Sequence, residues 1–224
     1  MIFFDIDDTL VTHSQSQRQA ALLFWETFAE RLPHSQQEFP TVWDAVMQKH
    51  FATFAAGEIS FGEHRLRRIR EIFDMGNQRL SDGEADALFQ VYLQHYEEKW
   101  ALFEDVLPCL ATLSRYNLGI ISNGNGKQQR RKLHDLGIES KFVTIVTSED
   151  LGVWKPKPEI FWEACRQASV APSECLYVGD NLRVDAQASQ AAGMRGIWLN
   201  RNHLSSSEAG VPVISSLAKL VAVI

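Results

Sequence analysis

Three carboxylates follow a short apolar run near residue 1. The apolar residues Ile2–Phe4 lead directly into Asp5-Ile6-Asp7-Asp8. Asp5 and Asp7 are two residues apart, so in an extended strand their side chains point to the same face. Two like charges held that close repel each other unless a cation or a proton compensates them. This spacing therefore predicts a metal site.

Other polar residues stand where strands and loops of one sheet are expected to end. Ser122 and Asn123 follow an apolar strand, Lys155 opens the rigid sequence Lys-Pro-Lys-Pro, and Asp180 follows Gly179 after another strand. In an open parallel sheet, ligands bind outside the carboxyl ends of the strands. We therefore expect a nucleophile, a hydroxyl, a lysine and a carboxylate cluster to converge at one edge.

The elements that must position these residues alternate after residue 100. Strand patterns alternate with helix patterns, and the predicted strands are 118–121, 142–146, 175–178 and 196–199. This order means βαβ crossovers and a parallel sheet. We therefore predict an α/β fold, a Rossmann-like parallel sheet sandwiched by helices.

The block between the first strand and residue 100 has a different pattern. Apolar residues recur at helical spacing, and Ser60-x-x-Glu63 and Ser81-x-x-Glu84 are typical of capping boxes. We predict a helical bundle over 15–100, inserted into a core formed by 1–14 and 101–224. Its aromatic residues are interpreted as bundle core rather than a ligand cage, and they include Trp25, Trp43 and Phe54.

Composition narrows the class of protein. The chain has 224 residues, 45% of them hydrophobic and 22% charged, as in ordinary soluble domains. A formal net charge of −6 argues against a nucleic-acid polymer as partner. No apolar stretch approaches the ~18 residues of a membrane span, and Asp5 interrupts any signal-peptide core. Three cysteines without close pairing favour a reduced, cytoplasmic protein.

Taken together, these residues resemble the four motifs of the haloacid dehalogenase superfamily, in their usual order. The matching sequences are Asp5-x-Asp7-x-Thr9, Ser122, Lys155-Pro-x-Pro and Gly179-Asp180-x-x-x-x-Asp185. The inserted bundle resembles that superfamily's small helical (C1-type) cap. Four elements in order are far more specific than a lone Asp-x-Asp.

The resemblance implies a hydrolase of phosphomonoesters. Asp5 would attack phosphorus and form an aspartyl-phosphate, while Asp7 would protonate the leaving oxygen and then activate water. The cofactor would be Mg²⁺, bound by the carboxylates of Asp5 and Asp180 and by the backbone carbonyl of Asp7. The acid at Asp7 favours phosphatases over the dehalogenases of similar fold, which lack it.

The same resemblance gives roles to the remaining motif residues. Ser122 with the Asn123 amide would hold a phosphoryl oxygen, and Lys155 would neutralise charge on the phosphoryl group and on Asp5. Asp185 would orient a bound water or Lys155. As alternatives, Lys157 competes with Lys155 for the motif lysine, and Asp185 could be a simple first-turn helix acid.

The sequence predicts the class of substrate and the range of oligomeric states, but not the individual substrate. We expect a small soluble phosphometabolite, such as a nucleotide or sugar phosphate, and a monomer or homodimer. The candidates for setting substrate specificity are the Glu58–Ser60 loop and three arginines, Arg65, Arg67 and Arg68. By default we interpret these arginines as ordinary surface residues. The run Lys127–Lys132 is interpreted as a solvated helix face rather than a substrate clamp. A β-phosphoglucomutase-like phosphomutase and a non-catalytic phosphate-binding or interaction protein remain the alternatives.

Overall fold

In the computed structural model the chain forms two compact units. Met1–His13 and Ala101–Ile224 make the core unit, and Ser14–Trp100 makes the helical unit. The structure describes residues 1–205 and 210–224. The sequence Ser205-Ser206-Ser207, which is too short to predict more than a loop, therefore lies mostly outside the described residues.

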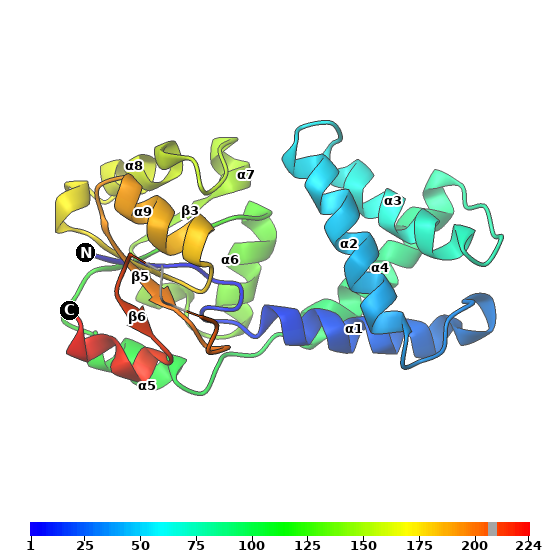
Figure 1. The fold of residues 1–224 in the computed structure, drawn as a ribbon, viewed down its shortest axis with the longest axis horizontal. Coiled ribbons are helices and arrows are strands. Elements are labelled where there is room, and N and C mark those ends of the chain that lie inside the picture. Colours follow the sequence, from blue (N-terminus) through cyan, green and yellow to red (C-terminus); the bar gives the residue numbers. More distant parts are fainter. Residues whose placement is uncertain (206–209) are drawn as a thin grey trace. The chain divides into compact units, whose positions relative to one another are not determined.

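The core unit is built on one parallel sheet, which confirms the predicted α/β fold (Figure 1). Among the described residues the sheet has six strands in the order β3-β2-β1-β4-β5-β6. Their bounds are β1 (Ile2–Phe4), β2 (Leu118–Ser122), β3 (Thr144–Thr147), β4 (Leu176–Gly179), β5 (Arg195–Leu199) and β6 (Val213–Ile214). The sequence pattern did not predict β6, because two residues are too few to show a period.

Helices cover both faces of this sheet. They are α5 (Val106–Thr112), α6 (Gly126–Asp135), α7 (Ser148–Leu151), α8 (Pro158–Gln167) and α9 (Ala188–Ala191). Phe4 packs in one apolar cluster with Leu133 of α6, and Phe3 packs in the other with Phe161 of α8. Since successive strand residues point to opposite faces, β1 is buried on both sides.

The chain does not stay extended through the first acidic cluster. The backbone N–H groups of Thr9, Leu10 and Val11 all donate to the carbonyl of Ile6, and Asp8 has a φ of 58°. This turn begins directly after Asp5, so Asp5 and Asp7 do not share one strand face. The extended backbone on which the expectation of a shared face depended is therefore absent at this point of the chain.

Apolar spacing predicts a helix over Val184–Ala192, and the structure begins it differently. A π-helical turn, Leu182–Gln187, precedes the short α9. The Asn181 side chain caps this turn, since its Oδ1 accepts from the backbone N–H of Arg183 at 3.1 Å and of Val184 at 3.0 Å. The wide turn carries Asp185 into the interior, where it is 2% exposed.

The helical unit packs around aromatic side chains. Its helices are α1 (His13–Phe28), α2 (Phe39–Ala55), α3 (Phe61–Asp74) and α4 (Asp82–Glu98). Phe24 contacts Trp43 and Tyr92, with ring centroids 5.3 Å and 6.5 Å away. These rings form the bundle core, as expected for Trp43.

Only one of the two predicted capping boxes closes. Ser81 and Glu84 exchange both bonds at the start of α4. At the start of α3, Ser60 Oγ accepts from Glu63 N at 3.1 Å, but the Glu63 carboxylate pairs with Arg67 Nε at 2.9 Å. The competing guanidinium one turn later explains the difference.

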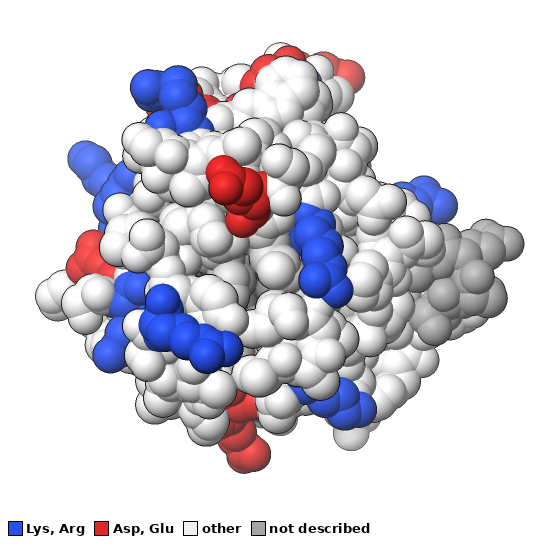
Figure 2. Space-filling model, turned by 90° about the vertical axis from the view of Figure 1, so that its left-hand side faces the viewer, with Lys and Arg blue, Asp and Glu red and all other residues white. Residues whose placement is uncertain are grey.

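Surface and interior are those of an ordinary folded chain. Among the described residues, no helix combines the length and apolar character that crossing a membrane requires. Figure 2 views the side that lies at the left of Figure 1, where uncharged atoms predominate and both signs of charge occur. Cys109, Cys165 and Cys175 are buried and free.

Candidate active site

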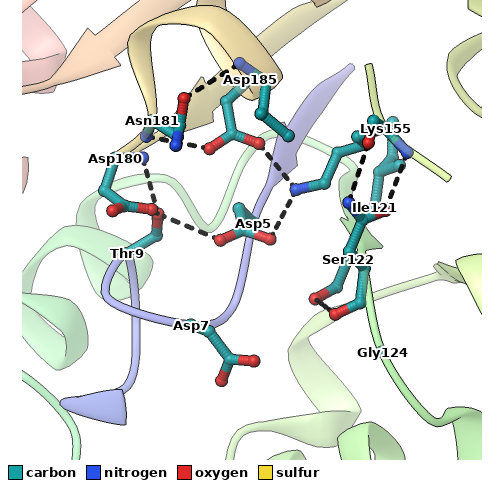
Figure 3. A network of polar contacts seen from close by, with 12 residues as sticks. Asp5, Asp7, Thr9, Ile121, Ser122, Gly124, Lys155, Asp180, Asn181 and Asp185 are labelled. Atoms are coloured by element: carbon teal, nitrogen blue, oxygen red, sulfur yellow. Dashed lines mark hydrogen bonds and ion pairs between the residues drawn. The ribbon is translucent and has the colours of Figure 1, made fainter. Parts of the chain in front are cut away.

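A buried lysine joins two carboxylates at the carboxyl edge of the sheet (Figure 3). Lys155 Nζ lies 2.7 Å from Asp5 Oδ1 and 2.6 Å from Asp185 Oδ1. It also donates to the hydroxyl of Tyr177 at 2.8 Å, and that hydroxyl donates to the carbonyl of Ile121 at 2.8 Å. Lys155 is thus held by three oxygen atoms. Of the two lysines that compete for the motif position, the structure places Lys155 beside the carboxylates and leaves Lys157 exposed.

The loop that carries Lys155 is fixed to the end of β2. The backbone N–H of Lys155 donates to Asn123 Oδ1 at 2.8 Å, and Asn123 Nδ2 donates back to the Lys155 carbonyl at 3.0 Å. Two reciprocal bonds define both the position and the rotation of this segment. The side-chain amide of Asn123 is therefore engaged in positioning Lys155.

A third carboxylate, Asp180, follows β4. Its backbone N–H donates to Thr9 Oγ1 at 3.0 Å, and the same hydroxyl lies 3.4 Å from Asp180 Oδ1 and 3.5 Å from Asp5 Oδ2. One carboxylate oxygen each of Asp5, Asp180 and Asp185 lie within 4.8 Å of one another. Each oxygen of Asp185 already accepts one hydrogen bond, Oδ1 from Lys155 Nζ at 2.6 Å and Oδ2 from the backbone N–H of Asn181 at 3.0 Å.

The crowding of these carboxylates changes their pKa values. Burial, together with repulsion from Asp185 and Asp7, raises the pKa of Asp5 to about 7 against the opposing effect of Lys155. Burial and the charges of Asp5 and Asp185 raise the pKa of Asp180 to about 8. A buried set of carboxylate oxygens whose charges repel one another is suited to a hard divalent cation. The residues present therefore fit Mg²⁺.

Lys155 keeps its charge in this interior. Burial lowers the pKa of Lys155, but the two carboxylates beside it outweigh that effect and raise the pKa above its usual range. A charge that is retained inside the protein acts through a lower effective dielectric than in water. Lys155 is thus a permanent cation next to Asp5.

Asp7 has a separate set of partners. Lys132 Nζ lies 2.5 Å from Asp7 Oδ1, Gln129 Nε2 donates to Oδ2 at 2.9 Å, and His13 Nδ1 lies 3.4 Å from Oδ1. Burial raises the pKa of Asp7, but His13, Lys132 and Gln129 together hold it well below its usual range. Figure 3 shows its side chain pointing away from Asp5.

The interpretation of Lys127–Lys132 as a solvated face is wrong for its last residue. The Lys132 side chain is 1% exposed, whereas Lys127 is exposed. Gln129, three residues before Lys132, is 2% exposed and also donates to Ser122 Oγ at 2.9 Å. Leu133 and Leu136 mark the covered face of this helix in the sequence, but nothing there indicates that the neighbouring Lys132 is buried as well.

The specificity candidates lie in the helical unit. The Glu58–Ser60 loop joins α2 to α3. Arg67 pairs with Glu63, and Arg65 lies over the ring of Phe61. The prediction that these arginines are surface residues is wrong for Arg68, which is 6% exposed and lies over the rings of Trp43 and Tyr92.

Comparison with known proteins finds relatives that are named phosphatases. The chain is 29% identical over 217 residues to the glyceraldehyde 3-phosphate phosphatase of Methanopyrus kandleri, covering 92% of this chain and 86% of the relative. It is 27% identical over 234 residues to the human N-acylneuraminate-9-phosphatase, covering 100% and 92%.

The fold also matches a solved structure. The HAD-hydrolase YfnB from Bacillus subtilis, bound to magnesium, superposes with a TM-score of 0.82 at 23% identity, covering 99% of this chain and 96% of that one. The model of the haloacid dehalogenase-like hydrolases matches residues 1–193. With the greater part of its length matched, the chain belongs to the haloacid dehalogenase-like hydrolase family.

Proposed function

We propose that this protein is a Mg²⁺-dependent hydrolase of small soluble phosphomonoesters, with Asp5 as nucleophile. The observation that carries the proposal is the Asp5 carboxylate, buried beside Lys155 and Asp180 at the edge where parallel strands end. The two curated relatives described above are phosphatases of small phosphorylated metabolites, which supports the same reaction class.

In the first step, the Asp5 carboxylate attacks phosphorus, and the bond to the leaving oxygen breaks as that oxygen takes a proton from Asp7. Because the pKa of Asp7 lies well below its usual range in the free protein, Asp7 must take up this proton together with the substrate, whose negative charge favours the protonated acid. This gives an aspartyl-phosphate on Asp5 and the free alcohol. In the second step, Asp7 takes a proton from a water molecule that attacks the same phosphorus. Inorganic phosphate leaves and Asp5 is restored.

The charge on the phosphoryl group would be met by groups already fixed in place. The hydroxyl of Ser122 would contact a phosphoryl oxygen, and Lys155, whose three N–H groups are held by Asp5, Tyr177 and Asp185, would neutralise charge on the phosphoryl group. Because the side chain of Asn123 holds the Lys155 backbone, its contribution would come from its backbone N–H. Donors fixed before the reaction stabilise the transition state without reorganising.

For the metal we propose the carboxylates of Asp5 and Asp180 with the backbone carbonyl of Asp7. When bound, Mg²⁺ would neutralise the repelling carboxylates and polarise a phosphoryl oxygen. Asp185 would act through Lys155 rather than on the metal, since one of its oxygens accepts from Lys155 and the other from the backbone N–H of Asn181. The magnesium bound in YfnB supports this choice of ion.

We further propose that the helical unit, Ser14–Trp100, is the cap that selects the substrate. Cap closure would exclude water from the reacting groups. The acid at Asp7 supports a phosphatase, because an alkoxide leaving group needs a proton and a halide does not. A phosphomutase would share this acid and differ in its product.

The test is an assay of purified protein with a panel of phosphomonoesters, with Mg²⁺ and with EDTA, beside Asp5→Asn. We expect phosphate release that requires Mg²⁺ and falls to background in Asp5→Asn. Release that is unchanged by EDTA, or equal in the variant, contradicts the proposal. Isomerisation of a sugar phosphate without phosphate release would instead assign a phosphomutase.

A further inference from the structure

Helix α6 presents two buried polar side chains to one carboxylate. Lys132 Nζ binds Asp7 Oδ1 at 2.5 Å, and Gln129 Nε2 binds Asp7 Oδ2 at 2.9 Å. Gln129 and Lys132 are three residues apart, so they lie on the same face of the helix. Because each holds a different oxygen of Asp7, the pair fixes both the position of the carboxylate and the rotation of its plane.

Burial of the Lys132 ammonium would cost free energy if the side chain served packing alone. A buried ammonium loses its hydration and is tolerated only when it is paired and hydrogen-bonded. The same helix carries Lys127 in an exposed position, where a lysine needs no such compensation. The interior position of Lys132 therefore calls for an explanation at Asp7.

The direction of the Asp7 side chain supplies one. In phosphoryl transfer the attacking and leaving oxygens lie roughly in line on opposite sides of phosphorus. A group that protonates the leaving oxygen must therefore stand apart from the nucleophile. Figure 3 shows the Asp7 side chain pointing away from Asp5, and Lys132 and Gln129 hold it in that direction.

Gln129 also reaches the hydroxyl proposed to bind phosphate. Its Nε2 donates to Ser122 Oγ at 2.9 Å. The O–H of Ser122 itself makes only a long bond, 3.4 Å to the carbonyl of Asn123, and can turn from there to a phosphoryl oxygen. The same amide thus orients Ser122 as a donor and Asp7 as an acid–base group.

We propose that Gln129 and Lys132 are positioning residues that hold Asp7 where the leaving oxygen of the substrate lies, with Gln129 coupling that position to Ser122. This inference rests on the proposed phosphatase function. It predicts that loss of Lys132 weakens catalysis only where the leaving group needs a proton. Loss of Gln129 weakens phosphate binding as well.

The experiment compares two substrates that differ in their leaving group. The first is the alkyl phosphate that the wild type hydrolyses fastest, and the second is p-nitrophenyl phosphate, whose phenolate leaves without a proton. kcat/KM with saturating Mg²⁺ is measured for the wild type, Lys132→Met, Gln129→Met, Asp7→Asn and Asp7→Asn/Lys132→Met. Lys127→Met is the matched control on the same helix.

We expect Lys132→Met to lower kcat/KM for the alkyl phosphate roughly 10- to 100-fold, and for p-nitrophenyl phosphate less than about threefold, since positioned acid catalysis contributes ~10²–10⁴-fold. In the Asp7→Asn background, Lys132→Met should change the alkyl rate less than about threefold, because residues that act as a unit are not additive. Lys132→Arg should restore part of the loss, and Lys127→Met should match the wild type.

Equal losses on both substrates, or the same loss with and without Asp7, would overturn the inference. If Lys132→Met does not fold, Gln129→Met carries the same comparison of leaving groups. Melting temperatures of the four proteins in the Asp7–Lys132 cycle give a readout without substrate, and independent, additive shifts would also contradict the pairing. A wild type that releases no phosphate overturns the proposed function itself, before any variant is compared.

Discussion

The ammonium of Lys155 lies 2.7 Å from Oδ1 of Asp5, although 150 residues separate the two in the chain. Both side chains are nearly excluded from solvent, at 3% and 8% exposure. The contact is possible because the loop after α7 and the end of β1 meet at the same edge of a parallel sheet. The catalytic proposal depends on this contact, and the groups around it can be tested one at a time.

Asp185→Asn should weaken both stability and turnover. The substitution keeps the shape of the side chain but removes the buried negative charge 2.6 Å from Lys155 Nζ. Breaking a buried ion pair costs roughly 3 kcal/mol. We expect a loss of unfolding free energy of about that size, measured by denaturant titration, together with a lower kcat because Lys155 is no longer held on two sides.

A surface pair provides the matched control for that variant. Asp150 pairs with Arg130 at 2.6 Å, but the two side chains are 45% and 41% exposed. Asp150→Asn should therefore cost less than about 1 kcal/mol and leave kcat unchanged. Equal losses in the two variants would show that the Lys155–Asp185 contact has no special role.

Gly179→Ala should disturb the same group by contact alone. A Cβ at Gly179 would lie 2.4 Å from both Cβ and Cγ of Asp185, so the acid must move. Overpacking of this kind costs about 1–3 kcal/mol. We expect a lower melting temperature and a reduced kcat, since a displaced Asp185 would also displace the Lys155 side chain that it holds.

The control for this variant is Gly83→Ala in the first turn of α4. No atom lies within 4 Å of a Cβ at Gly83. Alanine is a better helix former than glycine by up to about 1 kcal/mol, so this variant should be neutral or slightly more stable. A Gly179→Ala protein that behaves like Gly83→Ala would contradict the close approach of β4 to Asp185.

How far the sequence predicts this site depends on where each residue stands. Asp5, Ser122 and Asp180 follow predicted strands, and strand ends of a parallel sheet meet by topology, so their convergence was foreseeable. Tyr177 was missed because an inward-facing strand residue looks like core in any sequence. Lys132 was missed because a lysine beside the apolar residues of a helix is usually exposed, and only the packing of α6 shows that this one is covered.

The directions in which the site side chains point were less predictable than which residues belong to the site. The extended run was expected to carry Asp5 and Asp7 on one face, but the turn at Ile6 separates them. A turn formed by three N–H groups on one carbonyl has no clear residue signature here. The same holds for the π-helical turn at Leu182–Gln187, which aims Asp185 inward.

Stability should fall with rising pH when metal is removed. The raised pKa values of Asp5 (about 7) and Asp180 (about 8) mean that the folded protein keeps protons that the unfolded chain has already released. Stability decreases with pH wherever the folded state binds more protons. In EDTA, we therefore expect the melting temperature to decline from about pH 4 to about pH 8.

Asp180→Asn serves as the comparison for that decline. The variant lacks one of the two titrating groups and the repulsion it exerts on Asp5, so its melting temperature should decline less over the same range. Mg²⁺ should stabilise the wild type more at pH 8 than at pH 6, because protons compete with the ion for the carboxylates. Parallel pH curves for the two proteins would contradict the raised pKa values.

The most direct test of the catalytic proposal is to trap the phosphorylated enzyme. Asp7→Asn lacks the base that activates water, so with p-nitrophenyl phosphate and Mg²⁺ it should accumulate the aspartyl-phosphate. After acid quenching, mass spectrometry should find one added phosphoryl group on the peptide that contains Asp5, and none in Asp5→Asn. Release of nitrophenol without phosphorylated Asp5, or a phosphoryl group on another residue, would contradict Asp5 as the nucleophile.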